Sequence, residues 1–482
     1  MNYRSLSYTL GRILKICSLL FLPPVAVALI YREPPVSVLA FLSTGILTFV
    51  IGVLLMGKKP ERLRFSMREG LVLTFSLWGL LSLLGALPFM ITGDIPHLVD
   101  AVFETASGLT TTGSTILDNI ENMRQSCLFW RSFTHLIGGM GVLVLVFAIM
   151  PTGSSESMPI MKAEVPGHEF GKLVARMKNN SLILYGMYLG MTAVLVIFLL
   201  LGGMPLFDSL VTAFGTAGTG GFGIKSASIA YYQSPYIDMV ISIFMILFGI
   251  NFAVYYFFLI RQPKKALFFE ELRWFLAIIG AAFLAITLIV KPLYDSWGET
   301  LRHVFFTVSS SITTTGYVIV DYGSWPIVTH VILLLIMSIG SCAGSTGGGF
   351  KISRLAILIK NMAAEIKKTR DPRRMVAVSL DHKNIEHQER HVLRYLGIYI
   401  ACFMGFVLIL SFDVGDLETA ISGVVATMNN IGPALGSLGP IEHFGGLSDL
   451  SKVTLSFAMI GGRLELLPML VFFSPRTWRR LA

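Results

Sequence analysis

The chain has 482 residues, of which 54% are hydrophobic and only 14% are charged, and its mean hydropathy is +0.70. Soluble globular proteins carry about 25% charged residues, so this composition excludes an ordinary soluble protein and predicts an all-α polytopic membrane protein. The net charge of +9 would suggest nucleic-acid binding in a soluble protein, so its distribution along the chain has to be considered first. The cysteines form no CxxC motif, which gives no zinc or redox signal.

A helix that spans a bilayer needs about 20 apolar residues. The sequence predicts such spans at 10–31, 36–56, 70–92, 128–150, 181–203, 236–260, 272–291, 326–340 continuing into 350–362, 392–411 and 450–473. Four shorter apolar segments, rich in glycine and threonine, lie between these spans at 98–115, 206–223, 299–318 and 416–433. Each predicts a re-entrant segment, a short helix followed by extended chain, which membranes tolerate only inside protein or beside a water-filled cavity.

The basic residues predict the orientation. If the N-terminus is cytosolic, the inner segments hold 30 of the 38 Lys and Arg residues. These segments are 1–15, 57–69, 162–178, 261–273, 351–394 and 475–480. The positive-inside rule therefore predicts that both termini are cytosolic and that the four re-entrant segments open to the outside. The positive charge is then a matter of topology, and nucleic-acid binding is not expected.

The re-entrant segments resemble one another. Thirteen residues separate Asp100 from Gly113 in the first, and thirteen separate Asp208 from Gly221 in the second. The third ends in the same TTTG as the first, at Gly316, and the most divergent fourth ends at Gly432. A further glycine follows each of these inside the next span, at Gly138, Gly249, Gly340 and Gly461. The sequence thus predicts four parallel span–pore-loop–span repeats around one pore, preceded by two extra transmembrane helices.

Four parallel loops around one axis can offer backbone carbonyls, helped by threonine hydroxyls, in place of the water around a dehydrated cation. The short helices would direct their partially negative C-terminal ends at the same point, which favours a cation. Glycine suits the end of each loop because the chain must bend or approach the axis closely there. The predicted filter residues are Thr111, Thr112, Gly113, Thr219, Gly220, Gly221, Thr314, Thr315, Gly316, Asn430, Ile431 and Gly432. Glu104, in the first short helix, is interpreted as a structural hydrogen-bonding acid.

The four loops, the glycine-rich break SIGSCAGSTGGGFK (338–351) and IGGRLELL (460–467) resemble the TrkH/TrkG/KtrB superfamily of potassium transport proteins, and the extra N-terminal spans resemble its TrkH branch. The resemblance implies a homodimer in the cytoplasmic (inner) membrane, with one pore per subunit and inward K⁺ movement. It also implies a cytosolic, nucleotide-binding TrkA-type regulatory ring. K⁺ is then the transported ion, and this chain itself binds no cofactor. A glycine at each filter corner accompanies K⁺ preference in the family, and all four corners are glycine here.

The resemblance also implies a gate below the filter. Its residues would be Gly340, Gly344, Ser345, Thr346, Gly347, Gly348, Gly349 and Arg463. A plain helix break is the alternative interpretation of 340–349. Arg463 lies in the middle of a predicted span and should face the protein interior. It is either an electrostatic barrier to cations or one partner of an ion pair, with Glu465 as a candidate acid.

The predicted units are an N-terminal hairpin (1–56) and four pore repeats (57–161, 162–265, 266–390 and 391–482). The segment 364–394 is either a solvated basic loop or a docking surface for a cytosolic partner. Residues 218–223 match a dinucleotide-binding motif but lack its strand–turn–helix context. Residues 344–351 nearly match a phosphate-binding loop but do not have the lysine and the Ser/Thr at the required positions. Parallel repeats argue against a secondary transporter, which usually has inverted repeats, although coupling to H⁺ or Na⁺ stays open. No catalytic constellation suggests an enzyme.

Overall fold

The computed structural model describes residues 1–60, 66–141, 177–371, 379–380, 383–384 and 388–478. Several predictions fall partly outside these ranges. They include the end of the predicted span 128–150, the basic segments 57–69, 162–178 and 475–480, and the centre of 364–394.

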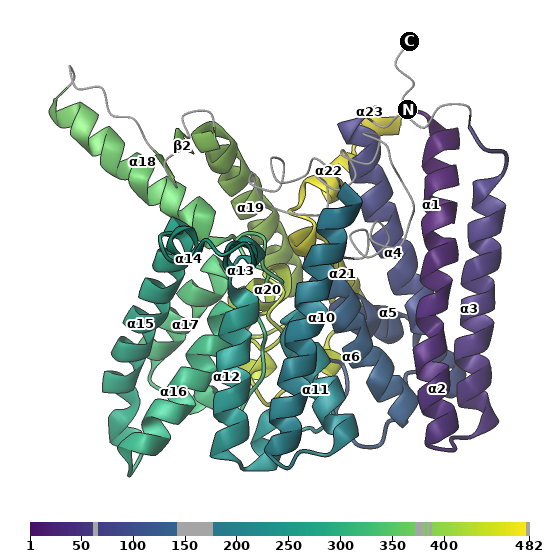
Figure 1. Ribbon diagram of the computed structural model, residues 1–482, viewed down its shortest axis with the longest axis horizontal. Coiled ribbons are helices and arrows are strands. Elements are labelled where there is room, and N and C mark those ends of the chain that lie inside the picture. The colour runs from purple at the N-terminus through teal and green to yellow at the C-terminus, as the bar shows by residue number, and fades with distance from the viewer. Residues whose placement is uncertain (61–65, 142–176, 372–378, 381–382, 385–387, 479–482) are drawn as a thin grey trace.

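The described chain is a bundle in which the axes of the long helices are roughly aligned with one another (Figure 1). Among the described residues, six helices are long and apolar enough to cross a membrane, or seven if one bent pair counts as a span. The six lie in α1–α2 (Tyr3–Cys17 and Leu22–Ile30, joined by the 3₁₀ turn Ser18–Phe21), α3 (Pro35–Met56), α4 (Met67–Thr92), α10 (Met177–Leu201), α15 (Glu270–Val290) and α19 (Gln388–Leu410). The prediction of a largely helical, multi-span chain is therefore confirmed.

Four short helices lie among the long ones, one in each predicted re-entrant segment. They are α5 (Leu98–Leu109), α11 (Leu206–Gly218), α16 (Trp297–Ile312) and α20 (Leu417–Met428). Each is followed, after a loop, by a second helix, namely α6 (Gln125–Gly139), α12 (Pro235–Gly249), α17 (Ile327–Ile339) and α21 (Asp449–Arg463). These second helices have only 13–15 residues, so each is shorter than the span predicted there.

Two of the second helices lie directly against the short helix of their own repeat at a glycine. A Cβ on Gly138 would collide with the carbonyl oxygen of Leu109, the last residue of α5, and one on Gly462 would collide with that of Met428, the last of α20. The contact in the fourth repeat therefore falls at Gly462, next to the predicted Gly461. The predicted Gly249 and Gly340 lie instead against the side chain of Thr313 and the backbone of Gly348.

The prediction of one span over 236–260 is wrong. The helix α12 ends at Gly249, and α13 (Phe252–Leu259) leaves it at an angle of 89°. The predicted span 450–473 is interrupted too, because α21 ends at Arg463 and α22 (Leu467–Phe473) begins after two residues, Glu465 and Leu466, with positive φ. The first break lies beside the glycine-rich segment described below, whose polar contacts replace helical hydrogen bonds there.

The remaining elements are short, apart from α18. They are α14 (Pro263–Leu267), α18 (Ile352–Arg370), α23 (Pro475–Trp478), the antiparallel strands β1 (Ser379–Leu380) and β2 (Lys383–Asn384), and the 3₁₀ turns Ser228–Tyr232, Lys291–Leu293, Tyr322–Ser324, Gly436–Leu438 and Phe444–Gly446. The helix α18 projects from the end of the bundle where α1 begins (Figure 1). The ring of Trp478 stacks on that of Tyr3 at 6.4 Å, so α23 lies at the same end. We call this end the terminal face and the other end the opposite face.

Candidate functional site: four loops in a ring

The four loops share an unusual backbone. We number the loops that follow α5, α11, α16 and α20 as loops one to four. In each loop one residue that carries a side chain has a left-handed φ of 55–58°: Thr111, Thr219, Thr314 and Asn430. This residue lies two positions after the short helix, except in loop two, where it follows the helix directly. The next amide then donates to a carbonyl five residues earlier at 2.8–2.9 Å, from Thr112, Gly220, Thr315 and Ile431. This pair of features is the Schellman ending of a helix, in which the left-handed residue is usually glycine. Four loops of different sequence therefore adopt one conformation.

The loops form a closed ring around one point. The four predicted corner glycines, Gly113, Gly221, Gly316 and Gly432, all have positive φ, between 72° and 104°. A Cβ on Gly113 would collide with the carbonyl oxygen of Gly220 in loop two, and the same relation joins loop two to loop three, and loop three to loop four. The last contact returns to loop one, because a Cβ on Gly432 would lie 2.8 Å from the carbonyl oxygen of Thr112. No corner has room for a side chain.

Several threonine hydroxyls of the loops bond within the protein, although the buried hydroxyl of Thr111 has no hydrogen-bond partner among the described residues. The hydroxyl of Thr112 pairs with that of Thr110 at 2.7 Å, and Thr315 pairs with Thr313 in the same way at 2.8 Å. Thr112 also accepts a hydrogen bond of 2.9 Å from the side chain of Asn430, which joins loop one to loop four. These side chains hold the loops to their helices and to one another. The backbone carbonyls are thus the oxygens that the four loops have in common.

A buried ion pair supports loop one from behind. Arg131 of α6 donates from Nε to Glu104 at 2.7 Å, and both side chains are about fully buried. Glu104 also accepts from the hydroxyl of Thr115 and the amide of Ile116, both at 3.0 Å. Its interpretation as a structural acid agrees with these contacts. Sequence reasoning missed Arg131, although a cation within a predicted span was a signal for it.

Replacing Arg131 with methionine should lower the midpoint of thermal unfolding clearly. Removing one partner of a buried pair leaves an uncompensated charge and typically costs about 3–5 kcal/mol. Unfolding of the purified protein in detergent, followed by intrinsic fluorescence, would measure the change. The double variant Glu104→Gln with Arg131→Met should recover much of the loss, because it leaves no buried charge. A double variant as unstable as the single one would contradict this assignment.

The glycine-rich segment 340–349 lies directly against loops three and four. The amide of Gly348 donates to the hydroxyl of Thr314 at 2.7 Å. A Cβ on Gly347 would come within 2.8 Å of the carbonyl oxygen of Thr313, and a Cβ on Gly348 would collide with that of Asn429. The predicted gate residues and the predicted filter residues are therefore neighbours in space, and the absence of side chains permits their contact.

The segment folds back on itself. Gly340 and Gly349 have positive φ and touch, since a Cβ on Gly349 would lie 2.6 Å from the Cα of Gly340. The hydroxyl of Ser345 pairs with that of Ser341 at 2.8 Å, and Lys351 donates from Nζ to the carbonyl oxygen of Gly347. The result is a closed loop inserted between α17 and α18.

Contacts with this loop explain the break between α12 and α13. The carbonyl oxygens of Gly249 and Phe248, at the end of α12, accept hydrogen bonds from the amide of Cys342 (3.2 Å) and the hydroxyl of Thr346 (3.2 Å). The amide of Phe252, at the start of α13, donates to the carbonyl oxygen of Gly344 at 3.0 Å. The loop thus satisfies backbone groups that a continuous helix would have paired internally.

Arg463 joins the glycine-rich loop to α6. Its guanidinium donates to the carbonyl oxygen of Thr346 at 2.7 Å and to those of Gly138 and Gly139 at 2.6 Å. Glu465, the acid suggested by the sequence as its partner, instead pairs with Arg354 of α18. The acid suggested as an alternative partner of Arg463 thus contacts a different arginine.

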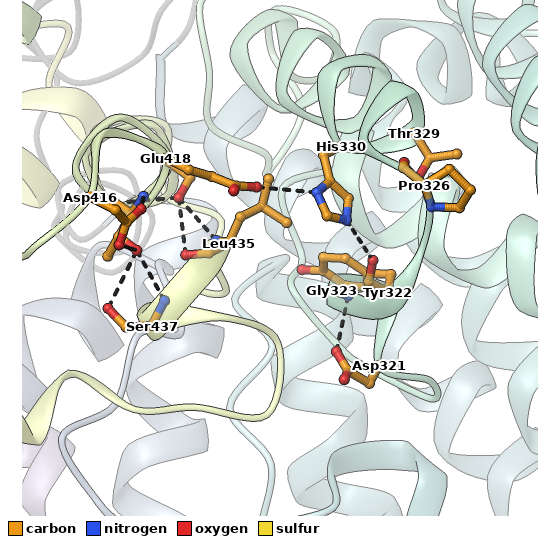
Figure 2. Close-up of polar contacts among 12 residues, drawn as sticks. Asp321, Tyr322, Gly323, Pro326, Thr329, His330, Asp416, Glu418, Leu435 and Ser437 are labelled. Atoms are coloured by element: carbon orange, nitrogen blue, oxygen red, sulfur yellow. Dashed lines mark hydrogen bonds and ion pairs between the residues drawn. The ribbon is translucent and has the colours of Figure 1, made fainter.

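The opposite face carries a second set of polar contacts (Figure 2). Nδ1 of His330, in the first turn of α17, lies 3.1 Å from Glu418 of α20, and its Nε2 lies 3.1 Å from the carbonyl oxygen of Tyr322. Asp416 caps α20, accepting from the amide and the hydroxyl of Thr419, both at 2.7 Å. These contacts fix the start of the fourth short helix.

Replacing Asp416 with alanine should cost about 0.5–2 kcal/mol, the usual effect of losing an N-cap. The hydrogen bonds from Thr419 hold the pKa of Asp416 below its ordinary range. A carboxyl group whose pKa is lowered by folding stabilises the protein above its unfolded pKa, and this stability is lost as the pH falls through the folded pKa. The unfolding midpoint of the wild type should therefore fall more steeply on acidification than that of Asp416→Ala. Parallel pH profiles would contradict the role of this cap.

Comparison with known proteins agrees with this geometry. Residues 38–480 match the TrkH family, which is described as cation transport proteins. The chain belongs to the TrkH family. This is a family of transport proteins and not of enzymes, as the sequence predicted.

Individual members of the TrkH family are similar over nearly their whole length. The chain is 33% identical to the Trk system potassium uptake protein TrkH of Salmonella typhimurium, covering 99% of this chain and 100% of that protein. It is also 33% identical to the Trk system potassium uptake protein TrkG of Escherichia coli, covering 99% of each. The crystal structure of the potassium transporter TrkH from Vibrio parahaemolyticus aligns with a TM-score of 0.88 at 30% identity, covering 99% of this chain and 100% of that one.

Proposed function

We propose that this protein is the ion-conducting subunit of a Trk-type potassium uptake system and moves K⁺ inward across the cytoplasmic membrane. The single observation that carries the proposal is the closed ring of four loops, each with its corner glycine against a carbonyl of the next loop. Such a ring supports a site in which backbone carbonyls replace the hydration shell of a cation. The names of its relatives, which are potassium uptake proteins, support K⁺ as that cation.

In this proposal the terminal face is cytosolic and the ring opens to the outside, as the distribution of basic residues predicts. Ions lose water at the ring and then meet the glycine-rich loop. That loop acts as the gate because it lies against loops three and four and is fastened by hydrogen bonds, such as that from Arg463, that can be released. The exposed leucines of the long helices, such as Leu54, Leu201 and Leu288, face the lipid.

The proposal includes a homodimer with one pore per subunit and a cytosolic, nucleotide-binding TrkA-type ring as the regulatory partner. The basic helix α18, which projects from the terminal face, is the surface that would meet this partner (Figure 1). The four predicted repeats, 57–161, 162–265, 266–390 and 391–482, each supply one loop. No cofactor is expected on this chain, and K⁺ is its cargo.

The test is ion flux into liposomes that contain only the purified protein, with K⁺ and Na⁺ gradients compared at a set membrane potential. Passive flux that follows the electrochemical gradient and prefers K⁺ is the expected result. Flux that requires an H⁺ or Na⁺ gradient would replace the channel-like mechanism with coupled transport. Flux of both ions without preference would contradict a K⁺-selective filter.

A further inference from the structure

Loop two departs from the other loops at one equivalent position. The residue before the corner glycine is Thr112 in loop one, Thr315 in loop three and Ile431 in loop four, but Gly220 in loop two. The first three side chains are buried. Loop two has no side chain there to hold its backbone in place.

The backbone of Gly220 does not require glycine. Gly220 is not among the glycines with positive φ, in contrast to its neighbour Gly221. A residue with a side chain could therefore adopt its conformation without strain. The exclusion of a side chain at Gly220 must come from a neighbour.

That neighbour is His135 of α6. A Cβ on Gly220 would collide with Nδ1 of the imidazole and would lie only 2.5 Å from its Cγ and 2.6 Å from its Cε1. His135 is fully buried and lies flat on the ring of Phe222, the residue after the corner glycine, with centroids 4.4 Å apart and planes at 17°. The imidazole thus occupies the space that a side chain of loop two would fill.

The fit continues along the same helix. A Cβ on Gly218, at the end of α11, would lie 2.7 Å from the carbonyl carbon of His135. Arg131, one turn earlier in α6, places its guanidinium 4.1 Å from the centroid of Phe222 and donates to the carbonyl oxygen of Gly223 at 3.0 Å. Neither ring nitrogen of His135 has a hydrogen-bond partner within the part of the chain that the structure describes. Its contact with loop two is therefore one of shape and stacking.

We propose that His135 is the positioning residue of loop two, which replaces the missing side chain of Gly220 and thereby sets the selection between K⁺ and Na⁺. The inference rests on the proposed function, since it assumes that the carbonyl of Gly220 is one of the four in the ring. The imidazole acts through the backbone and does not touch the ion. The other three loops achieve the same support with their own side chains.

A double-mutant cycle tests the proposal in the full-length protein in liposomes. His135→Ala opens space behind Gly220, and Gly220→Thr forces a side chain against the imidazole, so each should lower the K⁺/Na⁺ permeability ratio by about tenfold or more, as a distortion of about 1.4 kcal/mol would. The double variant His135→Ala with Gly220→Thr gives loop two the arrangement of loops one and three. Its permeability ratio should return to within about threefold of the wild type.

Leu128→Ala is the matched control, because Leu128 is also a buried side chain of α6 but is not among the atoms nearest to Gly220 or Gly221 of loop two. It should lower the unfolding temperature while leaving the permeability ratio unchanged. If Gly220→Thr does not fold, recovery of folding by adding His135→Ala supports the same steric exchange. An unchanged ratio in His135→Ala, or a double variant no better than the worse single one, would overturn the proposal.

The failure of this inference differs from the failure of the proposed function. If wild-type liposomes show no K⁺ preference, the proposed function fails and the permeability ratios carry no information. The cycle can then still be read from the unfolding temperatures. The double variant should lose less in unfolding temperature than the sum of the losses of the two single variants. Additive losses of stability would overturn the steric exchange itself.

Discussion

Gly113→Ala is expected to lower the K⁺/Na⁺ permeability ratio by at least about tenfold while the protein still reaches the membrane. The added Cβ would collide with the carbonyl oxygen of Gly220, and φ is +84° at this position. A left-handed residue with a Cβ costs roughly 1–2 kcal/mol, and about 1.4 kcal/mol already corresponds to a tenfold change in an equilibrium. Because the collision falls on a carbonyl of the next loop, the cost appears in the ring itself. Reversal potentials in mixed K⁺ and Na⁺ gradients measure the ratio.

Gly280→Ala is the matched control for this substitution. Gly280 lies in α15, has no positive φ, and a Cβ there would meet nothing within 4 Å. Alanine favours a helix more than glycine does, so this variant should be at least as stable as the wild type and equally selective. If Gly113→Ala and Gly280→Ala have the same permeability ratio, Gly113 is not a corner of the filter.

Arg463→Gln is expected to raise the flux through the protein alone by about tenfold. Hydrogen bonds from charged groups contribute about 1.5–3 kcal/mol each, and this variant weakens three that fasten the glycine-rich loop to α6. A loss of only about 1.4 kcal/mol would shift the balance between closed and open loop tenfold. The initial rate of K⁺ uptake into liposomes, normalised to the amount of protein, measures the effect.

Arg463→Lys separates the two roles considered for this residue. Lysine keeps the positive charge but lacks the planar fork that reaches several carbonyl oxygens at once. If the charge acts as a barrier to cations, the lysine variant should conduct like the wild type. If the arginine instead holds the glycine-rich loop to α6 by its hydrogen bonds, the lysine variant should conduct almost as fast as Arg463→Gln. Unchanged flux in both variants would rule out either role for Arg463.

The sequence by itself was sufficient for the helical membrane class, for the four short segments and for the glycines of the ring. The reason is that these features are local. The length of an apolar stretch identifies a span. A loop glycine that is followed, at a similar distance in each copy, by a second glycine marks a repeated unit. Glu104 was interpreted as a structural acid, and its contacts with Arg131, Thr115 and Ile116 agree with that interpretation.

The tertiary structure decided everything that depends on contacts between distant segments. Threonine and asparagine occupy left-handed positions that the sequence alone would assign to glycine, and only the packing of four loops against one another explains this. The break after Gly249 arises because the glycine-rich loop, nearly a hundred residues later, supplies the hydrogen bonds at α12. Arg463 contacts Gly138, and His135 fits against Gly220, across separations that no local pattern encodes. The sequence determined the parts, and the close approach of backbones from different repeats determined how they form a site.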